Sequence, residues 1–332
     1  MCCLKKALLI RYGAFGDAIM ISSIFPFIKR GGYHLTLNIA ERIVPVLRNN
    51  PYIDNIIVHE TDSVPNDKLS EHWDRLSQGY DRVINLSESI EKGLLVIEGS
   101  DEFWLPKEER HRMCNHNYYD RTMELAGYPV RGCTGELYFS QVEKMNGRAL
   151  RKKYKNKFLI LWALSGSSYH KAYPYTEYCI KVFLARHPDA FVITCGDVFC
   201  KVLEMDLQGH PQVKLCSDEW GIRKSMYTTK IADLVIGAET GITNAVGCFD
   251  TPKIVLLSHS SKENLTKYFD NCFSLYAQDC DCYPCHRLIY SREVCPIDNI
   301  TKAPKCMAGI EPEIVLDCME TVYERWRIGR NN

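Results

Sequence analysis

Short apolar runs alternate with helix-spaced segments along the first 90 residues. The run 7–10 is long enough for a buried strand, and a glycine-containing turn separates it from apolar positions that recur at helical spacing from Ile19 onward. The same pattern predicts further strands at 35–40, 53–58 and 81–86, and helices at 42–48 and around 73–79. Strands that alternate with helices imply a parallel sheet with right-handed crossovers.

The pattern begins again after a polar, basic stretch at 141–157. Strands are predicted at 158–162, 191–195, 231–237 and 253–258, and helices at 176–187 and 314–326. The basic stretch is typical of a solvated interdomain helix and linker, with a nucleic-acid arm as the alternative. We therefore predict an α/β protein of two Rossmann-like domains, 1–150 and 151–332, whose parallel sheets face each other across a cleft.

Composition narrows the classes of protein. The chain has 332 residues, 46% hydrophobic and 25% charged, with 41 Lys and Arg against 41 Asp and Glu. This balance does not favour a strongly electrostatic role on nucleic acid or an anionic membrane. No apolar stretch is long enough to cross a bilayer, and the N-terminus runs into the first strand without a secretion signal, so a cytoplasmic location is expected.

Candidate chemistry begins in the first turn. Gly13 and Gly16 allow a tight turn, and Asp17 falls at the carboxyl end of the strand, where α/β sheets bind ligands. Asp17 can cap the following helix or act as a base. The turn lacks both the Gly-x-Gly-x-x-Gly fingerprint and the lysine of a P-loop, so a different nucleotide chemistry is expected.

Loops after strands of the second half carry polar groups suited to phosphates. A Ser/Gly loop and a following lysine form a plausible pyrophosphate cradle from Ser165, Gly166, Ser167, Ser168 and Lys171. Gly196 and Asp197 end the next strand. Glu239 is placed to hydrogen-bond sugar hydroxyls, and Thr240, Gly241 and Ile242 offer backbone donors at a helix start.

Two other stretches are distinctive. Residues 101–127 are rich in His, Arg, Asn and Tyr, which suits either a polar surface or a groove for a hydroxyl-rich or phosphorylated acceptor. Among sixteen cysteines, many of them single within apolar runs, a cluster lies in a Cys-rich loop at 280–306. Four of its thiols could hold a structural zinc: Cys282, Cys285, Cys295 and Cys306. A loop buttress or a disulfide pair is the alternative.

Taken together, four stretches resemble the heptosyltransferases of lipopolysaccharide synthesis, the family-9 glycosyltransferases of the GT-B fold. The stretches are Ile10–Ala18, Asn50–Asp54, Ser165–Pro174 and Asp233–Gly241. The resemblance covers nearly the whole chain. The family usually has Asp where this chain has Glu239, and His where it has Asn244.

The resemblance implies inverting, metal-independent transfer from a nucleotide-diphosphate sugar, with Asp17 as general base and Lys171 stabilising the departing diphosphate. Ser165–Ser168 and Thr240–Ile242 would hold phosphates. ADP-heptose is the default donor, and no cofactor is required. The acceptor side lies in the N-terminal half, and the final helix packs back toward that half.

The acceptor and the activity leave alternatives open. The default acceptor is a lipopolysaccharide core sugar or another glycan, with peripheral contact to a membrane-borne acceptor. A hydroxymethylated nucleobase in DNA also offers a nucleophilic hydroxyl, although the neutral charge does not favour nucleic acid. A catalytically silent sugar-nucleotide binding protein would use the same cleft.

Overall fold

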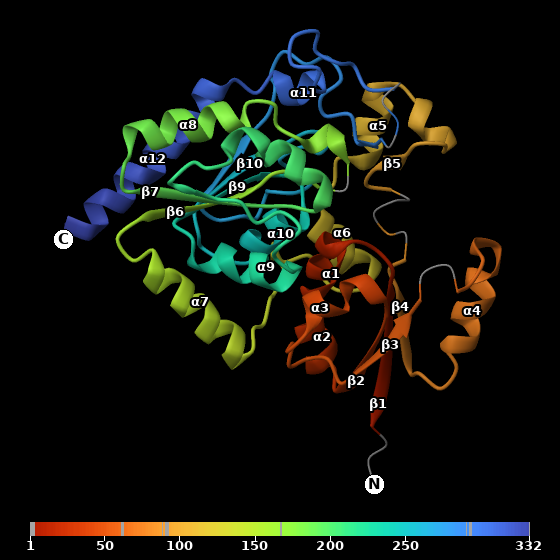
Figure 1. The fold of residues 1–332 in the computed structure, drawn as a ribbon. Coiled ribbons are helices and arrows are strands. Elements are labelled where there is room, and N and C mark those ends of the chain that lie inside the picture. The colour runs from red at the N-terminus through yellow and green to blue at the C-terminus, as the bar shows by residue number, and fades with distance from the viewer. Residues whose placement is uncertain are drawn as a thin grey trace.

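The computed structural model describes residues 4–60, 63–87, 89, 93–166, 168–289, 291 and 294–331. Two parallel β-sheets lie one in each half of the chain (Figure 1). Every pairing between their strands is parallel, as the alternation of strand and helix predicted.

The first sheet has the order β3-β2-β1-β4. Its strands are β1 (Lys5–Arg11), β2 (Tyr33–Ala40), β3 (Asn55–His59) and β4 (Arg82–Asn85). One face is covered by α1 (Phe15–Ser22), α2 (Phe25–Arg30), η1 (Glu41–Ile43) and α3 (Val44–Leu47). The chain between β3 and β4 forms η2 (Asn66–Lys68) and α4 (Leu69–Leu76). Helix α4 has no buried residue and stands on the other side of β3 and β4 from α1, α2 and α3 in Figure 1. Residues 7–11 of β1 are buried, since β1 is a central strand and side chains such as Ala7 and Leu9 pack against the helices on its face.

The second sheet has the order β11-β10-β9-β6-β7-β8. Its strands are β6 (Phe158–Ala163), β7 (Ala190–Cys195), β8 (Val213–Lys214), β9 (Leu234–Ala238), β10 (Lys253–Leu256) and β11 (Cys272–Leu275). The connections include η4 (Tyr169–Lys171), α8 (Thr176–Arg186), η5 (Val198–Leu207), α9 (Ile222–Ile231) and α10 (Gly241–Gly247). Strand β9 starts later than predicted, since α9 continues through Ile231.

A middle segment packs against the Cys-rich loop. It contains β5 (Val96–Ile97), η3 (Asp101–Trp104), α5 (Lys107–Cys114) and α6 (Tyr118–Leu125), and the loop contributes β12 (Arg287–Leu288) and α11 (Lys305–Ala308). Strands β5 and β12 form a parallel two-stranded ladder. Arg110 Nε donates to the carbonyl of Cys285 at 3.0 Å, and Arg287 Nε donates to that of Phe103 at 2.9 Å. The segment therefore joins the second half of the chain in space (Figure 1).

The final helix, α12 (Pro312–Asn331), corrects one prediction. It packs against α8 and β10 of the second domain instead of returning toward the first (Figure 1). Its apolar stripe, including Val315 and Met319, joins the core around Phe158. The amphipathic pattern predicts a helix that buries one face, but it does not specify which surface receives that face.

Helix α7 (Gln141–Lys153) contains the predicted boundary at residues 150 and 151 and packs against α9. No described helix is both long and apolar enough to cross a membrane.

An ion pair ties α7 and α9 to the first domain. Arg223 Nε lies 2.7 Å from Glu143 Oε1, and Arg223 Nη1 donates to the carbonyl of Val46 at 3.0 Å. Burial alone would raise the pKa of Glu143, but hydrogen bonds from Arg223 and from the main-chain N–H of Ser140 outweigh it and lower that pKa to about 2. The charged form of Glu143 therefore stabilises the fold.

We expect Glu143→Gln to lower the free energy of unfolding by about 1–2 kcal/mol at neutral pH, since the charged hydrogen bonds are partly exposed. Because the pKa of Glu143 is lowered in the folded protein, its contribution to the free energy of unfolding is complete above the ordinary pKa of 4.5. This contribution is lost as the pH falls toward 2. Urea titrations of both proteins at several pH values measure it. A difference that stays constant down to pH 2 contradicts the expectation.

Candidate active site

Asp17 is held by two contacts at the start of α1. Its Oδ1 lies 2.6 Å from Arg11 Nη2, and its Oδ2 accepts from the main-chain N–H of Ala14 at 2.6 Å. Arg11 is buried at the end of β1, and the Asp17 side chain keeps 14% exposure. A Cβ at Gly13 would lie 2.6 Å from Asp17 Oδ2, so this turn needs glycine there. Asp17 is the third residue of α1 and not its N-cap, but its carboxylate accepts from the N–H of the N-cap residue, Ala14, and still remains reachable.

Helices α1 and α10, which follow the loops after β1 and β9, meet between the two sheets. A Cβ at Gly16 would lie 2.9 Å from Asn244 Nδ2, and one at Gly241 would lie 2.6 Å from Phe15 Cβ. Helices α1 and α10 pack against each other along this contact, and one hydrophobic core runs from the first sheet through both helices to the second sheet. The turn carrying Asp17 is thereby brought to the loop after β9.

Lys171 ends η4 and is buried beside that loop. Its Nζ donates to the main-chain carbonyl of Glu239 at 3.0 Å. Burial lowers the pKa of Lys171, while the negative charges of Glu239 and Asp17 oppose that shift. Two carboxylates, one from each domain, therefore act on a single buried ammonium. Sequence reasoning selected all three residues. Lys171 contacts the main chain of Glu239, and Asp17 lies on α1, which packs against α10 beside them, while their roles stay a prediction.

Glu239 is buried, with both carboxylate oxygens hydrogen-bonded. Oε1 accepts from the main-chain N–H of Ser260 at 2.8 Å, and Oε2 accepts from the Ser258 hydroxyl and lies 2.9 Å from His259 Nδ1. Burial opposes ionisation, but the interaction with His259, followed by Lys171 and Ser258, outweighs it and lowers the pKa of Glu239 to about 2. The carboxylate is thus directed into the loop after β10.

The start of α10 uses several of its own donors. Thr240 caps the helix, and its hydroxyl accepts from the N–H groups of Ile242 at 3.1 Å and Thr243 at 3.3 Å. Asn244 Nδ2 donates to the carbonyl of Thr240 at 3.0 Å, and no partner within the described chain reaches the buried Oδ1 of Asn244. Phosphate binding by Thr240, Gly241 and Ile242 stays a prediction.

The Ser/Gly loop lies against the same site. A Cβ at Gly166 would lie 3.2 Å from Lys171 Cδ, so the loop backbone closely approaches the lysine. Ser168 Oγ lies 2.8 Å from His170 Nδ1 and donates to the carbonyl of Ile289 at 3.0 Å, and the Ser165 hydroxyl donates to the carbonyl of Ser168 at 3.3 Å. Ser167 lies outside the described residues.

Gly196 and Asp197 have a structural role at the end of β7. The Asp197 carboxylate caps η5 by accepting from the N–H groups of Phe199 at 3.0 Å and Cys200 at 3.2 Å. A Cβ at Gly196 would overlap the Cys200 side chain. Their role in binding the nucleotide stays a prediction.

The predicted zinc ligands do not form a metal site in this structure. Across the described parts of the chain, no group of three or more His, Cys, Asp or Glu side chains could hold a metal ion. Cys280, which was not in the predicted set, has its Sγ 3.5 Å from that of Cys282. Cys285, Cys295 and Cys306 instead line a cavity behind Lys171. Paired cysteine spacing indicates proximity and not ligand geometry.

Sequence reasoning missed the loop after β10. Ser258, His259 and Ser260 bind the Glu239 carboxylate, and Tyr118 of α6 reaches Ser260 with its hydroxyl 2.9 Å from Ser260 Oγ. The signal available in the sequence was a polar Ser-His-Ser run at the carboxyl end of a predicted strand, the same position that singled out the other loops.

Some polar residues of the stretch 101–127, predicted as a polar surface or an acceptor groove, pack against the second domain. Asn264 Nδ2 donates to the carbonyls of Cys114 and His116, and Asn117 Nδ2 donates to that of Glu263. Several polar groups of 101–127 thus fasten the middle segment to the second domain. An acceptor groove there stays a prediction.

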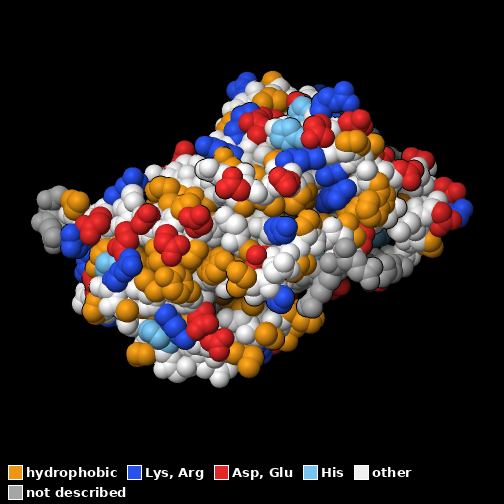
Figure 2. Space-filling view, turned by 90° about the horizontal axis from the view of Figure 1, so that it is seen from above, with side chains coloured by type: hydrophobic (Ala, Val, Ile, Leu, Met, Phe, Trp, Pro, Cys, Tyr) orange, Lys and Arg blue, Asp and Glu red, His pale blue; other side chains and the backbone are white. Residues whose placement is uncertain are grey.

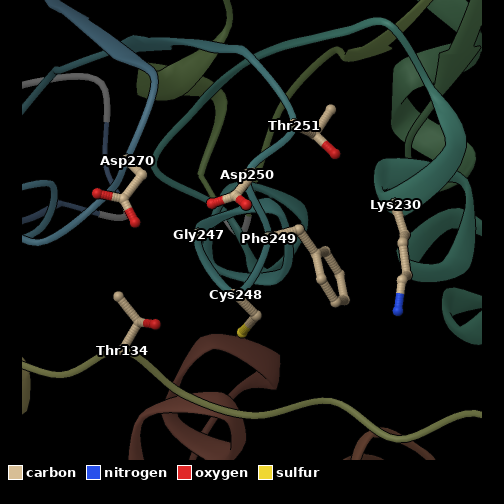
Figure 3. A pocket seen from close by; sticks show the side chains of 8 residues that line it. All are labelled: Thr134, Lys230, Gly247, Cys248, Phe249, Asp250, Thr251 and Asp270. Atoms are coloured by element: carbon tan, nitrogen blue, oxygen red, sulfur yellow. The ribbon is translucent and has the colours of Figure 1, made fainter.

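A separate pocket lies away from these residues. Its volume is about 420 Å³, and Figure 3 shows the side chains around it, with Asp250 and Asp270 beside the end of α10 and Lys230 on α9. Thr134 of the link between the domains faces it from the opposite wall. It contains none of the predicted site residues.

Two parallel sheets with the candidate site residues in loops at their carboxyl edges are the GT-B type of architecture. Known structures of this type are similar to the chain. The chain is similar to a glycosyl transferase family 9 protein from Veillonella parvula, with a TM-score of 0.68, 15% identity, and coverage of 97% of this chain and 98% of that one. It is also similar to E. coli ADP-heptose LPS heptosyltransferase II, with a TM-score of 0.65, 14% identity, and coverage of 97% and 99%.

A third similar structure is the dodecameric iron-containing heptosyltransferase TibC in complex with ADP-D-beta-D-heptose. Its TM-score is 0.57 at 11% identity, with coverage of 97% of this chain and 78% of that one. No protein-family model and no curated protein matches the chain. At these identities the similarity establishes the fold, so the GT-B prediction is confirmed.

Proposed function

We propose that the protein is an inverting, metal-independent glycosyltransferase that moves a sugar from a nucleotide-diphosphate sugar to an acceptor hydroxyl. The observation that carries the proposal is the packing of α1, the helix that carries Asp17, against α10, which follows Glu239 and the loop beside Lys171. Transfer between two substrates needs a base for one and a cation for the leaving group of the other. Such a pair at a domain interface supports group transfer over simple binding.

In the proposed step, the acceptor oxygen bonds to the anomeric carbon of the donor sugar from the face opposite the diphosphate. The acceptor proton passes to a carboxylate oxygen of Asp17. The bond between the anomeric carbon and the diphosphate oxygen breaks, and its electron pair leaves with the nucleoside diphosphate. Lys171 stabilises the negative charge that develops on that oxygen.

ADP-heptose is the proposed donor. Two of the structural neighbours are heptosyltransferases whose descriptions include ADP-heptose, and this supports testing that donor first. The proposed acceptor is a lipopolysaccharide core sugar or another glycan, reached by peripheral contact if it is membrane-borne. On the face in Figure 2, acidic and basic side chains are mixed, which does not favour a nucleic-acid acceptor.

The test is an assay of the purified protein with ADP-heptose and a panel of core-sugar acceptors, with EDTA present. We expect ADP release that depends on acceptor, and a product whose anomeric configuration, determined by NMR, is inverted relative to the donor. Activity that disappears with EDTA and returns with a divalent metal contradicts metal independence. Donor binding without transfer to any acceptor supports the silent sugar-nucleotide binding protein instead.

A further inference from the structure

His259 is a buried histidine whose ring orientation is fixed by its neighbours. It follows β10, and its residue exposure is 8%. Its Nδ1 lies 2.9 Å from Glu239 Oε2 and 3.2 Å from the Ser258 hydroxyl. A carboxylate facing Nδ1 selects the form in which Nδ1 carries a proton that it donates. The orientation leaves Nε2 as the ring nitrogen directed to any other partner.

Nε2 of His259 has no hydrogen-bond partner among the residues that the structure describes. The side chain lines a cavity of about 20 Å³ together with Lys171 and Ser168, both at least nine-tenths buried. This volume accepts one group of the size of a water molecule. Cys285 and Arg287 line the cavity from the Cys-rich loop.

The charges around the cavity select the ligand chemistry. Lys171 supplies an ammonium, and the Glu239 carboxylate contacts the other ring nitrogen of His259, Nδ1. The guanidinium of Arg287 lies over the Phe103 ring, and apolar side chains such as Leu288 and Ile289 complete the lining. A histidine ring donates from both nitrogens only when both carry a proton. An anionic oxygen placed between Nε2 and the Lys171 ammonium would receive charge-assisted hydrogen bonds from both groups while Nδ1 donates to Glu239, and such bonds are the strong ones. A non-bridging phosphate oxygen has the size of the single group that the cavity accepts.

We propose that His259 is a donor-binding residue, held by Glu239 so that Nε2 donates a hydrogen bond to a non-bridging oxygen of the diphosphate beside Lys171. The identity of that diphosphate as part of a sugar nucleotide rests on the proposed function. Glu239 is then a positioning residue, which acts through His259 and through its carbonyl contact to Lys171. This role differs from the contact with sugar hydroxyls that the position of Glu239 in the sequence predicts.

Two amide substitutions of His259 test the contacts of its two ring nitrogens separately. His259→Asn places an amide near Nδ1, which keeps the Glu239 contact and removes the donor at Nε2. His259→Gln places an amide near Nε2, which keeps the ligand-facing donor and loses the Glu239 contact. His187→Asn is the control, because His187 also pairs with a carboxylate, its Nε2 lying 2.7 Å from Glu320 Oε2 between α8 and α12.

The experiment is calorimetric titration of each full-length variant with inorganic pyrophosphate and with ADP, in EDTA, alongside thermal unfolding. We expect His259→Asn to weaken both affinities about tenfold or more, since a hydrogen bond to a charged group is lost. His259→Gln should retain more affinity than His259→Asn, and His187→Asn should match the wild type.

A purely structural role predicts the reverse order, with His259→Asn unchanged and His259→Gln weakened together with its melting temperature, and that result overturns the proposal. Wild-type protein that binds neither pyrophosphate nor ADP also overturns it. Pyrophosphate binding that depends on His259, in a protein that transfers no sugar, supports the anion site and contradicts the proposed function alone.

Discussion

Asp17→Asn is expected to lower the transfer rate by about 10²- to 10⁴-fold, because it removes the group that accepts the acceptor proton. The amide is almost the same size as the carboxylate, but its single oxygen can keep only one of the two contacts, to Arg11 or to the N–H of Ala14. Thermal unfolding of the variant therefore separates a disturbed turn from the loss of the base. Affinity for ADP should change little, since the proposed diphosphate contacts come from the other domain. Steady-state kinetics and calorimetry measure the two effects.

Asp120→Asn is the matched control for this substitution. Asp120 is also the third residue of a helix, α6, and its carboxylate also contacts neighbouring side chains, accepting from the Tyr268 hydroxyl at 2.8 Å. We expect its kcat to stay within about threefold of the wild type. An Asp17→Asn variant that keeps its kcat shows that another group takes the proton.

Lys171→Met should lower kcat by about 10²- to 10³-fold and weaken ADP binding, because it removes the buried positive charge proposed for the leaving diphosphate. Methionine preserves most of the apolar volume of the side chain, so the loss reports charge more than packing. The release of buried Glu239 and Asp17 from their cation is a second consequence of this change. Rapid-quench kinetics with saturating donor measures the chemical step.

Lys253→Met is a matched control for the loss of a buried lysine. Lys253 is fully buried at the start of β10, and its Nζ donates to main-chain carbonyls, including that of Phe249 at 2.9 Å. Both variants lose stability, but only Lys171→Met should lose activity per folded molecule. Equal losses in the two variants, corrected for the folded fraction, contradict a role for Lys171 in catalysis.

Most of the fold follows from local patterns in the sequence. The runs at 7–10 and 158–162 become central strands of the two sheets, because strands buried on both faces are continuously apolar. The ladder of β5 with β12 has no such signal, since each strand has two residues and the partners, such as Val96 and Arg287, are 191 positions apart. The docking of α12 on α8 depends on the same kind of nonlocal choice.

The candidate site was predictable in its residue types but only partly in its contacts. Asp17, Lys171 and Glu239 follow strand ends, and this position alone placed them at the carboxyl edges of the two predicted sheets. The hydrogen bonds that direct Glu239 to Ser258 and His259 depend on the adjacency of β9 and β10, which the alternating pattern does not specify. The cysteine spacing similarly gave proximity without ligand geometry.

The ladder of β5 with β12 has a consequence for how the chain can be divided into two parts. It anchors the middle segment to the Cys-rich loop, and the contacts of Asn264 with Cys114 and His116 add to the same anchor. Residues 96–114 belong to the N-terminal half of the sequence but are packed against the Cys-rich loop of the C-terminal half. A chain cut at the predicted boundary of residue 150 would therefore separate β5 and α5 from the loop that buries them, so the two halves of the sequence are not two separable pieces.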